Sequence, residues 1–102
     1  MSGSAGDLID SGSGATILRV TATTTWTAYP TVAGDKIKKF IVDSDIDNSG
    51  GRRVRVAYSS GSSDFVSLAP GDSYEEIGGG QTQIWIRTAS STATVSLSFI
   101  FE

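Results

Sequence analysis

The sequence predicts an all-β protein: an antiparallel β-sandwich, jelly-roll-like, with about eight short strands and an extended N-terminal arm. Apolar and polar residues alternate over many short stretches, as they do in half-buried strands. Turn-forming residues separate these stretches at intervals of roughly 8–12 residues, which is typical of sandwiches and small barrels. Gly, Ser and Thr fill 39 of the 102 positions, and no segment keeps a helical period over three turns.

The first fifteen residues differ from the rest of the chain. Eight of them are Gly or Ser, a composition typical of linkers, and Leu8 and Ile9 form the one apolar pair among them. We therefore divide the chain into an arm, residues 1–15, and a sandwich domain, residues 16–102. Because Gly and Ser bury too little apolar surface to offset the entropy of ordering, we expect the arm to dock on a neighbouring subunit through Leu8 and Ile9.

Two strands are expected before residue 33. Thr16–Thr23 alternates cleanly, and one of its faces carries Leu18, Val20 and Ala22. Trp26–Val32 is rich in β-forming residues, but Pro30 lacks a backbone N–H and restricts this segment to a sheet edge or a bend.

The next two strands flank a polar loop. Lys36–Val42 follows a turn at residues 33–35, and Asp43–Gly51 is expected to be a loop. Arg52–Tyr58 then alternates, and the residues that we expect to face inward are Val54, Val56 and Tyr58.

The second half of the domain supplies four further strands. They are Asp64–Leu68, Ser73–Ile77, Gln83–Thr88 and Ala93–Phe101. A turn at Ala69–Asp72 separates the first two, because Pro presets φ and Gly accepts a positive φ. Gly78–Gly80 is interpreted as a flexible connection. The expected core consists of Leu18, Val20, Val54, Val56, Ile84, Ile86, Val95, Leu97 and Phe99.

Composition argues against catalysis, cofactors and metals. The chain has no Cys and no His, so it lacks thiolate ligands, cysteine nucleophiles and the commonest general base. Glu75 and Glu76 are adjacent in a strand and point to opposite faces, so they do not form a glycosidase pair. We expect a protein that is not an enzyme and that has no catalytic, cofactor-binding or metal-binding residues.

The acidic stretch after the third strand resembles a calcium loop only superficially. Counted from Asp43, the sixth and twelfth positions of an EF-hand would be Asn48 and Val54, where the motif requires Gly and Glu. The carboxylates of Asp43, Asp45 and Asp47 and the amide of Asn48 remain oxygen ligands for a looser calcium site, but Asp, Asn, Ser and Gly also favour a solvated turn. The turn is the preferred interpretation.

Basic residues do not indicate nucleic acid. Eight basic and eleven acidic side chains leave a net charge of −3. Seven of the basic residues lie in or beside three expected strands. They are Lys36, Lys38 and Lys39 in the first, Arg52, Arg53 and Arg55 in the second, and Arg87 in the third. We interpret them as a solvated face or a protein contact. No stretch approaches the length of a membrane span, so neither nucleic acid nor membrane is an expected partner.

Aromatic residues supply the candidate interaction site. Trp85 shares the polar face of its strand with Arg87, and such a tryptophan anchors interfaces or packs under a covering layer. Trp26 lies among threonines, and Tyr29 precedes a proline. Two functions remain open for them, a protein interface and a platform for stacking sugars. The candidate interface residues are Leu8, Ile9, Trp26, Tyr29, Trp85 and Arg87.

Four stretches together resemble a known class of proteins. They are TATTTWTAYPTVAGDKIKKFIV, RRVRVAYSS, VSLAPGDSYEE and IWIRTASSTATVSLSFIFE. This succession resembles small β-sandwich structural proteins of tailed bacteriophages, such as capsid decoration, minor head or appendage proteins. The resemblance covers residues 16–102 and brings no binding motif with it.

The resemblance implies a non-enzymatic virion structural protein, a capsid decoration (cement) or minor head protein. It would stabilise the particle through contacts with the major capsid protein or with neighbouring head or tail subunits. Proteins of this class commonly form trimers, so a homotrimer is expected. The alternative is a carbohydrate- or receptor-binding module of the tail fibre or adhesion type. In that module Trp26, Tyr29 and Trp85 would be exposed and coplanar, whereas an assembly would cover them.

Overall fold

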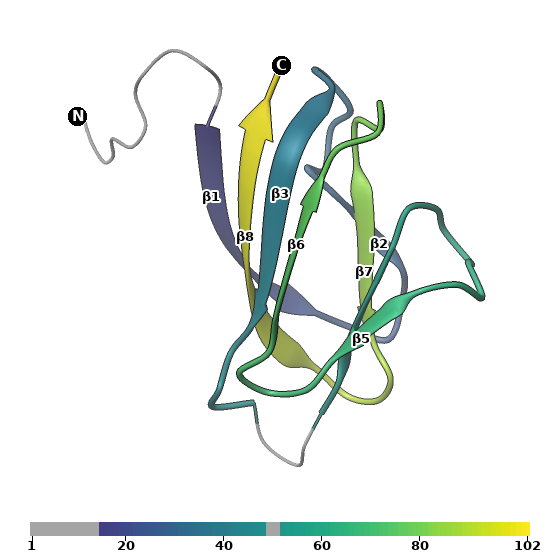
Figure 1. Cartoon of the computed structure of the whole chain (residues 1–102). Helices are drawn as coiled ribbons and strands as arrows, with labels where there is room; N and C mark the ends of the chain where they lie inside the picture. The colour runs from purple at the N-terminus through teal and green to yellow at the C-terminus, as the bar shows by residue number, and fades with distance from the viewer. Residues whose placement is uncertain (1–14, 49–51) are drawn as a thin grey trace.

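Eight strands form two four-stranded antiparallel sheets in the computed structural model, which describes residues 15–48 and 52–102 (Figure 1). The strands are β1 (Ala15–Ala22), β2 (Thr27–Tyr29), β3 (Ile37–Ser44), β4 (Val54–Ala57), β5 (Val66–Leu68), β6 (Ser73–Ile77), β7 (Ile84–Thr88) and β8 (Ala93–Phe101). Within the described part of the chain no helix has the length and apolar character needed to cross a membrane.

The strand order is that of a jelly roll. The first sheet has the order β1-β8-β3-β6 and the second the order β2-β7-β4-β5. Each strand of the first half pairs with its counterpart from the second half: β1 with β8, β2 with β7, β3 with β6 and β4 with β5. A long hairpin that turns between β4 and β5 and winds around an axis produces this pattern. The prediction of a jelly-roll-like sandwich with eight strands is confirmed.

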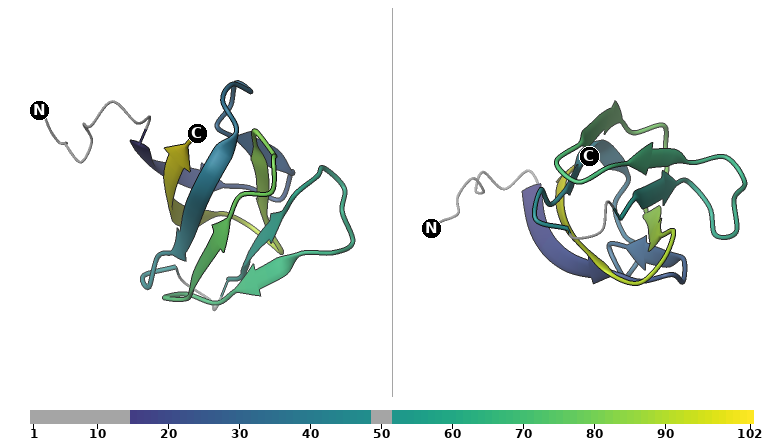
Figure 2. Two further views of the ribbon diagram at one scale, coloured as in Figure 1. Left: turned by 45° about the horizontal axis from the view of Figure 1, so that its top comes forward. Right: turned by 90° about the horizontal axis from the view of Figure 1, so that it is seen from below.

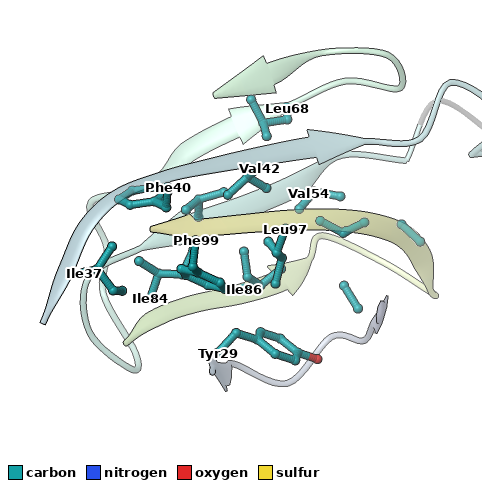
Figure 3. Packing of buried hydrophobic residues seen from close by; sticks show 14 residues of the cluster. Tyr29, Ile37, Phe40, Val42, Val54, Leu68, Ile84, Ile86, Leu97 and Phe99 are labelled. Atoms are coloured by element: carbon teal, nitrogen blue, oxygen red, sulfur yellow. The ribbon is translucent and has the colours of Figure 1, made fainter. Parts of the chain in front are cut away.

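The two sheets pack against each other, as the further views of the ribbon show (Figure 2), and the buried hydrophobic side chains lie between them (Figure 3). In β8 every second residue from Ala93 to Phe99 is buried, which is the alternation that the sequence predicts. Phe40, Phe99 and Ile84 come from different strands and meet at the centre (Figure 3). The predicted core residues are all confirmed, with Leu18 and Val20 partly buried at its border.

Two expectations about the middle of the chain are wrong. Tyr58 is 48% exposed and is not buried in the core, because β4 ends at Ala57 and the chain bends at the next residue; its ring contacts that of Phe40 at the rim of the core. Asp43 belongs to a strand and not to a loop, because β3 continues to Ser44 and Asp43 pairs with β6 and β8. The backbone N–H of Ser44 then donates to the carbonyl of Asp72 at 2.9 Å, which continues the pairing beyond β6.

The turn between β5 and β6 carries the chain from the second sheet to the first. The backbone N–H of Asp72 donates to the carbonyl of Ala69 at 2.9 Å, and Gly71 has a φ of 88°. The carboxylate of Asp72 accepts from the backbone N–H of Ala69 at 2.9 Å. Pro at the second position and a positive φ at the third define a type II turn, so this prediction is confirmed.

Gly78 holds the end of β6 against β3, contrary to its interpretation as part of a flexible connection. Its backbone N–H donates to the carbonyl of Lys38 at 2.9 Å. A Cβ at this position would lie 1.7 Å from the carbonyl oxygen of Ile37. Only glycine permits this close approach of two backbones.

Candidate interaction surface

The outer face of the second sheet carries a cluster of aromatic and arginine side chains. Trp26 precedes β2, Trp85 and Arg87 lie on β7, Arg55 lies on β4, and Phe65 precedes β5. We call these five residues the aromatic–arginine face. They point away from the core because their neighbours along the strands, such as Ile84, Ile86, Val54 and Val56, are buried between the sheets.

Each arginine of this face lies over an aromatic ring. The guanidinium carbon of Arg87 is 5.7 Å from the ring centroid of Trp26, and that of Arg55 is 4.6 Å from the centroid of Phe65. The rings of Trp26 and Phe65 are 6.4 Å apart and inclined at 57°. The two distances from a guanidinium carbon to a ring centroid fall within the range of cation–π attraction. The two aromatic residues therefore converge above the middle of the sheet from its opposite edges.

Arg55 and Arg87 are also direct cross-strand partners. Like charges in this position repel each other. Among the described residues the ion pairs are Arg19 with Asp45 and Lys39 with Glu75, so neither Arg55 nor Arg87 forms an ion pair with a described carboxylate. The face therefore presents two positive charges without a direct ion-pair partner in the described part of a chain of net charge −3.

Trp85 lies between two small residues. Its cross-strand partners are Ala28 on β2 and Ala57 on β4. Trp85 is half-buried, whereas Ala57 is only 2% exposed although alternation places it on the outer face. Larger side chains of the face must cover this alanine. A shallow pocket of about 250 Å³ adjoins it, and its lining includes Ala57, Tyr58 and Phe65.

The structure brings together three of the six residues predicted for the interface, Trp26, Trp85 and Arg87. Tyr29 is 8% exposed and belongs to the core of the sandwich, away from these three residues. The physical reason is alternation within β2, which turns Ala28 outward and Tyr29 inward. Leu8 and Ile9 lie outside the described residues.

Sequence reasoning did not include Phe65 or Arg55 among the candidate interface residues, although it interpreted Arg55 as part of a solvated face or a protein contact. Arg55 alternates with two buried valines, which places it on the outer side of its strand, but the pattern does not reveal which strand lies beside it. Phe65 stands just before β5 and reaches over the sheet from the far edge. Only the strand order brings these residues within reach of Trp26 and Arg87.

A second polar cluster lies at the rim between the sheets. The hydroxyls of Tyr58 and Tyr74 are 3.1 Å apart, and the Tyr74 hydroxyl donates to a Glu76 carboxylate oxygen at 3.2 Å. Both tyrosine rings pack against Phe40. The hydrogen bond with Tyr58 and partial burial raise the pKa of Tyr74 well above its ordinary value of 10.0. These contacts hold the β4 and β6 ends of the sandwich together.

The acidic stretch after β3 is used for internal contacts. Asp45 accepts from the backbone N–H of Asp47 at 2.9 Å and pairs with Arg19, and both contacts lower the pKa of its carboxyl. The side chain of Asn48 donates to the carbonyl of Thr94 at 3.0 Å and accepts from its N–H at 2.7 Å. Among the described residues no three acidic side chains gather as a metal site would require.

The chain has no match among protein-family models, and neither the curated proteins nor the solved structures contain a protein significantly similar to it.

Proposed function

We propose that this protein is a non-enzymatic structural subunit that binds neighbouring proteins through the aromatic–arginine face. The observation that carries the proposal is the composition of that face, with two tryptophans, a phenylalanine and two arginines on one side of one sheet. Tryptophan and arginine are the residues that most often dominate binding energy at protein interfaces.

The geometry favours a protein partner over a sugar. A stacking platform requires aromatic faces that are exposed and coplanar. Here the rings of Trp26 and Phe65 are inclined at 57°, and a guanidinium lies over each of them. Tyr29, which the sequence offers together with Trp26 and Trp85 for stacking, is buried. The jelly roll itself does not discriminate, because both virion subunits and lectins use it.

The partner surface is expected to be acidic and partly apolar. Arg55 and Arg87 have no carboxylate partner among the described residues, so carboxylates of a partner would relieve the repulsion between them. The aromatic rings would supply apolar contact area next to these ion pairs. This combination gives both affinity and orientation.

The sequence resemblance leads us to assign this subunit to a virion, as a capsid decoration or minor head protein acting as a homo-oligomer, with a trimer as the preferred state. Its binding partners would be the major capsid protein or adjacent head or tail subunits. A small domain of this kind acts through the area that it buries on the shell.

Density-gradient sedimentation of the native source material tests the proposal. Detected by antibody, the chain should sediment with large particles and should be released when salt screens its arginines. A chain found only in the slow fractions would contradict it. Specific, saturable binding on a glycan array, lost in Trp26→Ala, would support the carbohydrate alternative instead.

A further inference from the structure

The outer face of the first sheet carries an exposed apolar patch opposite to the aromatic–arginine face. Each of its four strands contributes one outward isoleucine: Ile17 from β1, Ile100 from β8, Ile41 from β3 and Ile77 from β6. We call these four residues the isoleucine patch. Ile17, Ile77 and Ile100 are 62%, 74% and 40% exposed, and Ile41 is half-buried.

Strand register places the four isoleucines in two adjacent rows of one face. One row of cross-strand partners runs Ile17, Ser98, Ile41, Glu75, and the adjacent row runs Ala15, Ile100, Lys39, Ile77, so the Lys39–Glu75 ion pair lies between Ile41 and Ile77. The isoleucines thus zigzag across the sheet, about 14 Å from the first strand to the fourth. Single exposed apolar residues need no explanation, but four isoleucines from four adjacent strands on one face favour a surface that another segment covers.

A hollow adjoins the patch at its β6 side. It has a volume of about 430 Å³ and is lined by Lys39, Glu75, Glu76 and Ile77. The Nζ of Lys39 lies 2.6 Å from a carboxylate oxygen of Glu75. The volume of the hollow gives room for an aliphatic side chain next to Ile77. The ion pair neutralises Lys39 and Glu75, and the carboxylate of Glu76 adds one negative charge to the lining.

The chain that precedes β1 ends at the patch. Ala15, the first residue of β1, is the cross-strand partner of Ile100. Residues 1–14 lie outside the described part of the chain, and Leu8 and Ile9 are their one apolar pair. Six residues from Ile9 to Ala15 reach at most about 20 Å when extended, and a Gly- and Ser-rich chain of that length spans about 13 Å on average.

We propose that Leu8 and Ile9 of the same chain bind the isoleucine patch. Their average reach matches the width of the patch, and a short tether gives an effective concentration in the millimolar range, which favours the chain's own segment over that of another copy. From the sequence alone, a neighbouring subunit is the expected docking surface for the arm, because the apolar surface of the arm by itself is too small to order it. The isoleucine patch supplies further apolar surface within the same chain. The inference concerns a different face from the proposed function and does not depend on it.

Introduced cysteines test the contact, because the chain has none of its own. The test variant carries Ile9→Cys and Ile77→Cys in the full chain. The control carries Ile9→Cys and Lys36→Cys, because Lys36 is exposed and lies just before β3, at the same end of the sheet but outside the patch. Oxidation is followed on a non-reducing gel and by mass spectrometry at low protein concentration.

We expect the test pair to form an intramolecular disulfide at least about tenfold faster than the control pair, a ratio that corresponds to a modest docking preference. Adding Leu8→Ser to the test variant should reduce the rate to that of the control. Equal rates in the test and control variants would overturn the proposal, since they would show an undocked tether. Faster formation of disulfide-linked dimers than of the intramolecular bond would overturn it too, because a second copy would then cover the patch.

Discussion

Arg55 and Arg87 are cross-strand partners on the outer face of the second sheet, and each places its guanidinium over an aromatic ring. Two like charges at this position destabilise a sheet, and cation–π contacts of similar size offset that cost, so the pair brings the isolated domain little net stability. Stability of the isolated domain does not explain this pair. The proposed acidic partner would explain it, because its carboxylates would supply the missing negative charge.

Neutralising one arginine of this pair should separate folding from binding. In Arg87→Gln we expect the free energy of unfolding, measured by urea titration, to change by no more than a few tenths of a kcal/mol, because lost repulsion offsets the lost ring contact. Sedimentation with particles should weaken and become less sensitive to salt. The matched control is Lys38→Gln, an exposed cation outside the face. If both variants sediment with particles as the wild type does, the arginine pair does not take part in assembly.

Trp85→Ala should weaken assembly more than it weakens folding. Truncation of a tryptophan at an interface typically costs about 2 kcal/mol or more, which is roughly a thirtyfold loss of affinity. Ile84→Ala is the contrasting variant, because Ile84 is fully buried and its truncation should cost about 2–5 kcal/mol of fold stability. Chemical denaturation and particle binding of both variants give the comparison. A Trp85→Ala protein that unfolds as readily as Ile84→Ala would show that Trp85 serves the core.

Much of this architecture can be predicted from alternation alone. Strands such as β7 and β8 have one buried and one outer face, so Ile84, Ile86, Val95 and Leu97 were assigned to the core correctly. Alternation failed at Tyr58, because the rule holds only while the strand continues and β4 ends one residue earlier.

The composition of the candidate site was less accessible to sequence reasoning. Trp85 and Arg87 share a strand, so their common face follows from periodicity. Phe65 is 22 residues before Arg87 and reaches the same surface only because β4 and β5 complete the second sheet next to β7. Strand order arises from the winding of the whole chain, and no local pattern encodes it.

Gly78→Ala should destabilise the fold. The added Cβ would lie 1.7 Å from the carbonyl oxygen of Ile37, so β3 and the end of β6 must separate, and overpacking of this kind typically costs about 1–3 kcal/mol or more. Gly34→Ala is the control, since a Cβ there has no neighbour within 4 Å. Its effect on the free energy of unfolding should be neutral or stabilising by up to about 1 kcal/mol. Equal melting temperatures of the two variants would disprove the close approach at Gly78.

The Tyr58–Tyr74 contact should make stability sensitive to alkaline pH. The pKa of Tyr74 is raised in the folded protein, so its contribution is fully present below its ordinary pKa of 10.0 and is lost as the pH rises above that value towards the folded pKa. The wild type should be more stable than Tyr74→Phe by about 1 kcal/mol at pH 8, and this difference should shrink above pH 10. Unfolding by urea between pH 8 and 11 measures it. A difference that stays constant over this range would refute the assignment.

Quenching of tryptophan fluorescence by acrylamide tests the binding role of the aromatic–arginine face most directly. The chain has two tryptophans, Trp26 and Trp85, and both belong to this face, so the intrinsic fluorescence reports on it without a label. In the isolated chain acrylamide should quench both residues appreciably, because both are partly exposed. In the particle reconstituted with partner proteins in which a non-fluorescent analogue replaces tryptophan, the quenching constant should fall severalfold as a partner covers the face. An unchanged quenching constant on assembly would contradict the account.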